Sequence, residues 1–236
     1  MDSAQGRQIE AVRLATFGTG ARVVGLTSVR ARAGVSSLAA ALAQWCIPQG
    51  SVVLVRLCDP PAAVPAQATC WMPMERAVLR HVQPDPLGFD RLTILPEAEH
   101  VPAFRDTDAL RTLFARLRER YAAIIVDLAS LDPQEPVAVP ATMAAPACES
   151  VVMVCRANRD TRPEARKAAE TLRTAGAPLH SVVINDCFNP TVAEQWSTGL
   201  RRLARLIPSL APNLAPNLAT RTLDRLRRSR VLNSRA

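Results

Sequence analysis

VVGLTSVRARAGVSSLAAAL, residues 23–42, is the stretch that decides the fold of this chain. It opens on a strand-like apolar run, Val23–Leu26, and continues into a short loop that contains Gly34. An Ala/Leu-rich segment follows, which predicts a helix that begins near Ser36. A strand, a tight loop and a helix in immediate succession are typical of a βαβ unit in a parallel sheet.

The loop in this stretch has the outline of a phosphate-binding loop but lacks its lysine. In the Walker A pattern, strand–GxxxxGK[ST]–helix, backbone N–H groups and the lysine hold the phosphates of a nucleotide. When the chain is aligned on Gly34 and Ser36, the first glycine becomes Val29 and the lysine becomes Val35. Lys167 is the only lysine in the sequence. Two alternatives follow: a nucleotide enzyme with an altered loop, or the fold of one without its chemistry.

The composition indicates one globular domain. With 236 residues, 48% of them hydrophobic, the chain is long enough for a well-buried core. Apolar runs are about 4 to 7 residues long, against the ~20 of a membrane-spanning helix, and no secretory signal is recognisable. We therefore expect a cytoplasmic protein. The six cysteines show no CxxC spacing, which favours buried free thiols over a zinc site or disulfides.

The net charge of +8 is concentrated in arginines near the end of the chain. These are Arg201, Arg202, Arg205, Arg221, Arg225, Arg227, Arg228, Arg230 and Arg235. Such a segment suits an anionic membrane or an acidic partner, and we do not expect nucleic acid. The simpler alternative is a solvated basic tail. We divide the chain into a domain at residues 1–208 and, at residues 209–236, a Pro/Asn spacer with the basic tail.

Apolar runs alternate with helical patterns, which predicts an α/β fold with a doubly wound, mostly parallel sheet flanked by helices. Strands are expected at Val23–Leu26, Val52–Leu57, Leu92–Leu95, Ala123–Asp127, Val151–Cys155 and Ser181–Asn185. Helices are expected at Gln8–Phe17, Ser36–Cys46, Asp106–Arg120, Pro163–Ala175 and Val192–Leu206. Pro133–Pro146 is too rich in proline for a long helix, so we expect a loop beside the carboxyl edge of the sheet. Thr161 or Asp160 should cap the helix that Pro163 opens, and Gly176 should end it.

Five blocks in order resemble the cytoplasmic domain of the bacterial tyrosine kinases (BY-kinases) and related P-loop proteins of capsular and exopolysaccharide synthesis. They are TSVRARAGVSS (Thr27–Ser37), similar to TSAxPGEGKST; VVLVRLCDPP (Val52–Pro61), in the place of the strand before DxDxRxP; LTILPEAEHVPAF (Leu92–Phe104); YAAIIVDLASLDP (Tyr121–Pro133), similar to YDxVIIDxPPxxD; and VVMVCRANRDTRPEARKAAETLRTAGAPLHSVVINDC (Val151–Cys187). The resemblance covers about residues 8 to 190. It implies a P-loop NTPase fold, related to the partitioning and septum-positioning ATPases, with a nucleotide at the carboxyl ends of the strands.

The resemblance also implies a site. The positions that match the family's nucleotide site are Arg30, Arg32, Gly34, Ser36, Ser37 and Asn185. In the family this site takes ATP or ADP with Mg²⁺, and Ser36 and Asp127 stand at the positions of the magnesium ligands. Arg30 matches a signature lysine of the related ATPases, and Arg30 with Arg32 would be the substitute for the missing cation. Ser36 suits an N-cap equally well, and Asn185 suits a turn at the end of a strand.

Several charged groups of the family are absent. Val35 cannot bridge phosphates, and the two carboxylate positions of the second Walker strand fall on Arg56 and Cys58. Asp59 is one residue away from the family's second carboxylate position, so its side chain should point to the opposite face of the strand. Phosphoryl transfer without these groups loses most of its electrostatic stabilisation. Tyr121 is the only tyrosine and precedes a strand, so we expect it to pack rather than to accept phosphate. We therefore expect no catalysis and no cofactor.

One part of the family's association motif is retained. Glu10 and Arg13 match the first two positions of ExxRxxR, which pairs subunits in the family, and Thr16 stands in the third. The leading hypothesis is a non-catalytic cytoplasmic regulator or scaffold of surface polysaccharide polymerisation and export, for capsule, exopolysaccharide or adhesin. Its partners would be further copies of itself and the cytoplasmic segment of a membrane co-polymerase that determines chain length, at the inner face of the membrane. The alternatives are a weak ATPase or tyrosine kinase that uses Arg30 and Arg32, and a positioning protein tethered by its basic tail.

Overall fold

The computed structural model describes residues 3–57, 72–75, 77–93, 100–132, 137–157 and 159–186, and everything below refers to them. Several predictions lie wholly or in part outside these residues: the positions Cys58 and Asp59, residues 94–99 of the block Leu92–Phe104, residues 133–136 of the proline-rich segment, the helix Val192–Leu206, the boundary after residue 208, and the basic tail.

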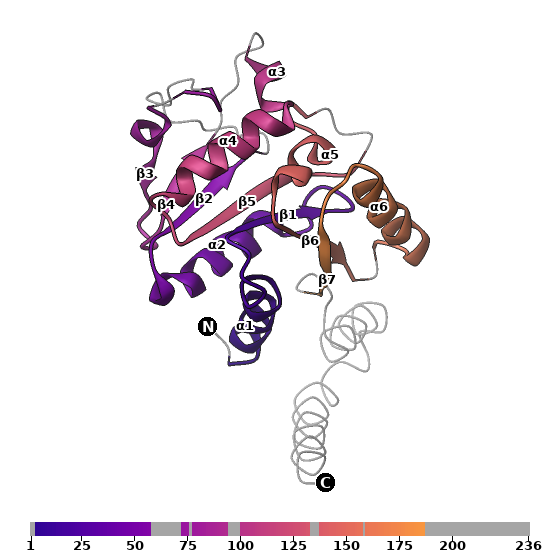
Figure 1. Cartoon of the computed structure of the whole chain (residues 1–236). Helices are drawn as coiled ribbons and strands as arrows, with labels where there is room; N and C mark the ends of the chain where they lie inside the picture. Colours follow the sequence, from indigo (N-terminus) through magenta and orange to yellow (C-terminus); the bar gives the residue numbers. More distant parts are fainter. Residues whose placement is uncertain are drawn as a thin grey trace, which may run out of the picture. The chain divides into compact units, whose positions relative to one another are not determined.

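A seven-stranded sheet of order β3-β4-β2-β5-β1-β6-β7 forms the centre of the fold (Figure 1). The strands are β1 (Val23–Ser28), β2 (Val52–Arg56), β3 (Gln83–Pro84), β4 (Asp90–Thr93), β5 (Ala123–Ser130), β6 (Ser150–Arg156) and β7 (Leu179–Asn185). Every pair is parallel except β3 with β4 at one edge. The predicted mostly parallel sheet is confirmed.

Helices cover both faces of this sheet (Figure 1). They are α1 (Ser3–Phe17), α2 (Val35–Cys46), α3 (Val101–Phe104), α4 (Thr107–Arg118), α5 (Ala141–Ala144) and α6 (Arg162–Thr174), with single 3₁₀ turns η1 (Ile47–Gln49), η2 (Val78–His81) and η3 (Ala145–Ala147). Apolar residues of α1 and α2 belong to one core layer, whereas those of α4, α5 and α6 belong to the other. The fold is therefore doubly wound, as predicted.

Strand β5 shows why the apolar runs in the sequence are continuous. Ile124 and Val126 are buried in the layer below α4, and Ile125 is buried in the layer below α2. Because successive side chains of a strand point to opposite faces, a strand covered on both sides must be apolar at every position. The segment Ala123–Ala129 is buried throughout, and its single charged residue is Asp127.

The caps of two helices follow from local sequence. Asp106 accepts hydrogen bonds from the N–H groups of Asp108 and Ala109 at the start of α4. Thr161 and Glu164 form a capping box at the start of α6, which confirms Thr161 as the N-cap. Gly176 has φ of 81° and lies just past the end of α6, as predicted.

Two local predictions need correction. The N-cap of α2 is Gly34, with φ of 86° and no side-chain hydrogen bond, so the alternative role of Ser36 as N-cap is wrong. The reason is that α2 begins one residue earlier than predicted, at Val35, which places Ser36 inside its first turn. Within Pro133–Pro146 the structure describes residues from Val137 onward. They form no long helix, but a short α5 is present where a loop was predicted, after Pro140.

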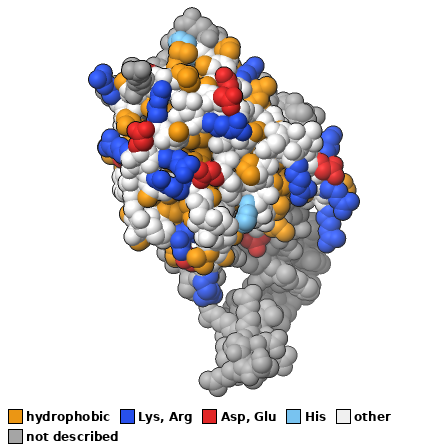
Figure 2. Space-filling model, viewed as in Figure 1, with side chains coloured by type: hydrophobic (Ala, Val, Ile, Leu, Met, Phe, Trp, Pro, Cys, Tyr) orange, Lys and Arg blue, Asp and Glu red, His pale blue; other side chains and the backbone are white. Residues whose placement is uncertain are grey.

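The described cysteines are buried, and the surface carries charges of both signs. Cys46, Cys148 and Cys155 are buried and free, and burial raises the pKa of Cys148 to about 12. On the face in Figure 2, basic and acidic side chains lie interspersed. No helix in the described part of the chain combines the length and apolar character needed to cross a bilayer.

Candidate functional site

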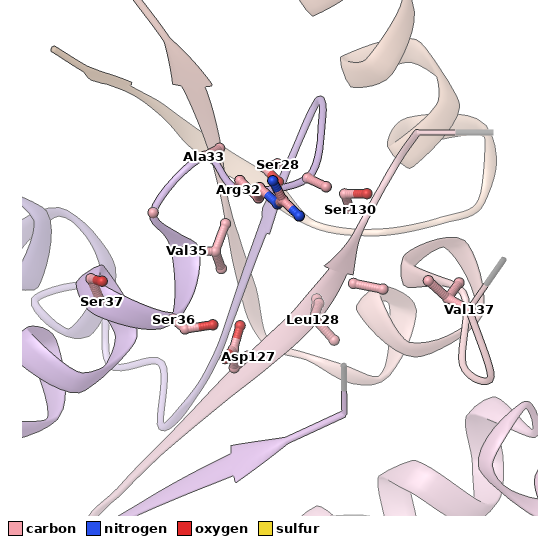
Figure 3. A pocket seen from close by; sticks show the side chains of 13 residues that line it. Ser28, Arg32, Ala33, Val35, Ser36, Ser37, Asp127, Leu128, Ser130 and Val137 are labelled. Atoms are coloured by element: carbon pink, nitrogen blue, oxygen red, sulfur yellow. The ribbon is translucent and has the colours of Figure 1, made fainter. Parts of the chain in front are cut away.

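A cavity of about 270 Å³ opens at the carboxyl ends of β1 and β5, beside the first turn of α2 (Figure 3). The cavity is lined by Ser28, Ala31, Arg32, Ala33, Gly34, Val35, Ser36, Ser37, Asp127, Leu128, Ala129, Ser130 and Val137. Carboxyl ends of parallel strands are the usual place for ligands in open α/β sheets. Most of the predicted site residues therefore meet in one place. Val137, in the described part of the proline-rich segment, lies at this edge of the sheet, as predicted.

The loop between β1 and α2 holds two residues in the left-handed backbone region. Gly34 has φ of 86° and Arg32 has φ of 58°. Arg32 stands where the family has a loop glycine, so the backbone turn is retained although the side chain has changed. A left-handed conformation costs a residue with a Cβ about 1–2 kcal/mol. Arg32 adopts this conformation in spite of the cost, so contacts of the surrounding loop must stabilise it.

Asn185 ties this loop to the end of β7. Its Nδ2 donates to the carbonyl oxygen of Ala33 at 2.8 Å. A Cβ added to Gly34 would lie 2.5 Å from the same Nδ2, which leaves space there for glycine alone. Asn185 thus holds the loop by a direct hydrogen bond, in addition to its position as the last residue of β7. A residue predicted at the nucleotide site is therefore also part of the loop's own support.

Ser36 and Asp127, the two positions predicted for a metal, face one another. Ser36 projects from the first turn of α2 and the carboxylate of Asp127 from β5, and their oxygens point toward the same space (Figure 3). Ser36 is exposed, whereas the side chain of Asp127 is 3% exposed. Val35 lies between the loop and this space and offers neither charge nor hydrogen bond (Figure 3).

Arg56 reaches Asp127 from the neighbouring strand. The two residues are direct register partners on the parallel strands β2 and β5. The Nε of Arg56 lies 3.8 Å from Oδ2 of Asp127, and the Arg56 side chain is 21% exposed. Sequence reasoning counted Arg56 only as a lost carboxylate and missed this contact. The two residues are far apart in sequence, and no local pattern gives the register of their strands.

A magnesium ion fits this set of groups poorly. Mg²⁺ requires oxygen ligands, usually one or two carboxylates together with phosphates and water. Here a guanidinium stands within 4 Å of the Asp127 carboxylate, at a position where the family has a further carboxylate. The described residues contain no group of three or more His, Cys, Asp or Glu that could hold a metal ion.

Arg30 is engaged by acidic groups at the start of α6. Its guanidinium forms an ion pair with Glu164, and its Nε lies 4.0 Å from Oδ1 of Asp160, a residue whose side chain is fully buried. Glu164 has a pKa lowered to about 2. The largest cause is the hydrogen bond from the backbone N–H of Thr161, followed by the bond from the Thr161 hydroxyl and then the bond from Arg30. Asp160 in turn accepts from the N–H of Arg156 through Oδ2 at 2.6 Å. Arg30 thus points to its own chain's carboxylates.

Arg32 and Ser37 complete the predicted nucleotide site. Both are exposed and line the cavity, and the guanidinium of Arg32 extends toward Ser130 at the end of β5 (Figure 3). The structure therefore separates the two arginines that the sequence grouped together. Arg32 faces the cavity, whereas Arg30 faces α6.

Tyr121 is the only tyrosine of the chain and is buried, with 1% exposure. Its hydroxyl donates to Oδ2 of Asp90 at 2.7 Å, which joins the segment just before β5 to the start of β4. Burial and this bond raise its pKa. The predicted packing role agrees with this position, because a phosphate donor could not reach the hydroxyl in the folded domain.

Glu10 and Arg13 lie on α1, away from the cavity. The Arg13 guanidinium donates twice to the Glu10 carboxylate, at 2.6 and 2.8 Å, and once to Oε1 of Gln49 at 3.0 Å. The pair lowers the pKa of Glu10. Both side chains remain partly exposed, and their predicted part in an interface between subunits stays a prediction.

The strand order, the β1–α2 loop and the cavity at the strand ends define the class of fold, which is that of the P-loop NTPases. Among solved structures the chain is similar to the BceF tyrosine kinase domain, with a TM-score of 0.57, 21% identity and coverage of 75% of this chain and 74% of that one. It is also similar to the chimerical protein CapA2B2, with a TM-score of 0.59, 19% identity and coverage of 78% and 85%. A third similar structure is cobyrinic acid a,c-diamide synthase from Mycobacterium smegmatis with a bound ATP analog and magnesium, with a TM-score of 0.53, 14% identity and coverage of 78% and 82%.

These likenesses confirm the P-loop fold. No protein-family model and no curated protein matches the chain.

Proposed function

We propose that this protein is a non-catalytic relative of the BY-kinases that regulates or scaffolds the polymerisation and export of a surface polysaccharide. It acts in the cytoplasm at the inner face of the membrane, through the cytoplasmic segment of a membrane co-polymerase that determines chain length. The support is of two kinds. The fold is similar to that of the BceF tyrosine kinase domain, and Asp127, which lines the cavity, is paired with Arg56 in a way that opposes phosphoryl transfer.

The contact between Arg56 and Asp127 carries the non-catalytic part of the proposal. Phosphoryl transfer depends on positive charge at the β- and γ-phosphates and on a metal ion held by carboxylate and hydroxyl groups. Val35 supplies no charge, Arg30 is paired with Glu164, and Asp127 already faces a guanidinium. The remaining cation of the loop is Arg32, which by itself does not replace both the lysine and the metal.

The surface of α1 supports the scaffold part of the proposal. Glu10 and Arg13 keep the spacing of the family's association motif, are partly exposed, and form a pre-organised pair on a helix outside the cavity. An exposed pair of this kind contributes little to the stability of one chain. Its retention fits a role in contacts with a second copy or with the co-polymerase segment.

A phosphate-transfer assay tests the absence of catalysis. The purified chain is incubated with γ-labelled ATP and Mg²⁺, and both free phosphate and labelled protein are measured. We expect both to equal those of an Asp127→Ala preparation purified in parallel. Hydrolysis or autophosphorylation that depends on Asp127 would refute the proposal and favour the weak ATPase or tyrosine kinase.

A complementation experiment tests the scaffold role. A strain that lacks the protein is complemented with wild type, with Ser36→Ala, with Glu10→Ala/Arg13→Ala, or with Asp108→Ala/Arg111→Ala. The last variant is a matched control, because Asp108 and Arg111 form an i,i+3 pair on another helix. We expect loss of polysaccharide, or altered chain length, only for the α1 variant.

The same four proteins are then tested for binding to the cytoplasmic segment of the co-polymerase and for self-association by sedimentation. We expect the α1 variant alone to lose association. If Ser36→Ala abolishes polysaccharide while the α1 variant has no effect, the cavity and not the α1 surface is the functional part, and the scaffold proposal fails.

A further inference from the structure

We infer that Arg56 takes the place of a divalent cation at Asp127, so that the charge of this carboxylate is compensated within the chain and the cavity takes no metal. This inference deepens the proposed function, on which it rests, by naming the residue that makes the site independent of metal. It concerns the role of one arginine and can be tested without any measurement of activity.

The first argument is burial. Asp127 is 3% exposed on a strand that is otherwise apolar from Ala123 to Ala129. A buried carboxylate requires a compensating cation or strong hydrogen bonds, because removal of the charge from water is costly. In the structure Arg56 meets this requirement, with its Nε 3.8 Å from Oδ2 of Asp127.

The second argument is the fixed position of the arginine. Arg56 is the last residue of β2 and lies opposite Asp127 in the register of β2 and β5. The next residue, Leu57, donates its N–H to the carbonyl oxygen of Asp127 at 2.9 Å and is itself buried. The backbone is therefore bonded to β5 directly after Arg56. The guanidinium therefore reaches Asp127 from the end of a strand that is hydrogen-bonded to β5.

The third argument concerns the space that a metal would use. The hydroxyl of Ser36 and the carboxylate of Asp127 point toward a common space, which is the arrangement for a metal in the family (Figure 3). A metal there would compete with Arg56 for the carboxylate and would be repelled by its charge. A carboxylate at position 56 would attract a metal ion, whereas the arginine that is present takes the place of the metal's positive charge.

Binding of Mn²⁺, followed by electron paramagnetic resonance of the free ion, tests the inference on the full-length chain. We expect no saturable binding by wild type. Arg56→Asp should bind Mn²⁺ more tightly than Arg173→Asp by about tenfold or more. The control makes the same change of charge at an exposed residue of α6, outside the cavity lining. The gain should disappear in Arg56→Asp/Asp127→Asn.

Two outcomes would overturn the inference. One is saturable binding of Mn²⁺ by wild type that Asp127→Asn removes. The other is an Arg56→Asp protein that folds but binds Mn²⁺ no better than Arg173→Asp.

If Arg56→Asp does not fold, Arg56→Gln is compared with wild type by thermal unfolding. We expect a lower melting temperature that Mn²⁺ raises in Arg56→Gln but not in Arg56→Gln/Asp127→Asn. An unchanged melting temperature, or one that does not respond to Mn²⁺, would count against the inference.

Hydrolysis of ATP by wild type in the presence of a chelator would refute the proposed function and leave this inference standing. Binding of Mn²⁺ by wild type without hydrolysis of ATP would refute this inference and leave the proposed function standing.

Discussion

Two ion pairs lie near the cavity, and they differ in the solvent exposure of their side chains. At the strand ends, Arg56 and Asp127 are 21% and 3% exposed and join two central strands. At the loop, Arg30 and Glu164 are 47% and 36% exposed and join the loop to α6. Burial raises the cost of an unpaired charge, whereas solvent screens an exposed one. An arginine takes part in both pairs, but we expect the buried pair to matter more for stability than the exposed pair.

The largest expected effect is that of breaking the strand-end pair. Arg56→Ala leaves the carboxylate of Asp127 without this compensating cation and should lower the free energy of unfolding by about 3 kcal/mol. Urea denaturation followed by circular dichroism measures the change. The double variant Arg56→Met/Asp127→Leu should recover most of it, since neither charge of this pair remains. A single variant as stable as wild type would show that the two pairs do not differ as described.

The next effect concerns the loop backbone. Gly34→Ala should destabilise the chain by about 2 kcal/mol, because φ of 86° is unfavourable for alanine and its Cβ would meet Asn185. Gly176→Ala is the matched control: φ is 81°, and nothing lies within 4 Å of an added Cβ. The difference between the two variants in denaturation measures the contact with Asn185. Removal of the amide in Gly34→Ala/Asn185→Ala should reduce that difference.

A smaller effect is expected for the loop pair, and it depends on pH. The pKa of Glu164 is lowered from 4.5 to about 2, so its stabilising contribution is present above pH 4.5 and is lost as the pH falls toward 2. Wild type and Glu164→Gln should therefore differ in melting temperature at neutral pH and converge at acidic pH. Titration of Glu164 by NMR adds a test: Thr161→Ala and Arg30→Ala should each raise its pKa only in part, because the hydrogen bond from the backbone N–H of residue 161, the largest cause, remains in both variants.

No gain of activity is expected from the lysine alone. Val35→Lys restores the Walker A residue, but Arg56 still faces Asp127, so hydrolysis of ATP should remain at background. Val35→Lys/Arg56→Asp is the informative comparison, measured by release of phosphate with Mg²⁺. Activity of the single variant would show that the strand-end pair does not block the site. Melting curves of both variants establish that they are folded.

The sequence predicted the repeating elements well, because their signals are local. The helix over α6 was located from Thr161 and Gly176, whose capping roles depend on neighbouring residues only. Strand β1 was predicted too short. Thr27 and Ser28 are polar but buried, and Thr27 donates its hydroxyl to the carbonyl oxygen of Ala129 at 2.6 Å. An apolar pattern cannot identify polar residues whose hydrogen bonds are satisfied by a distant strand. The two-residue strand β3 gave no pattern at all.

The residues of the site were predicted, whereas their partners were not. The sequence by itself determined that Val35 stands where the phosphate-binding loop has lysine and that Arg56 stands where the family has a carboxylate, since both follow from position along the chain. It also determined the alternation of strands and helices that gives the fold. Only the tertiary structure decided that Arg56 faces Asp127 and that Arg30 faces Glu164. The physical reason is that strand order and register are set by packing of the whole sheet, so contacts between distant residues appear only when the sheet is assembled.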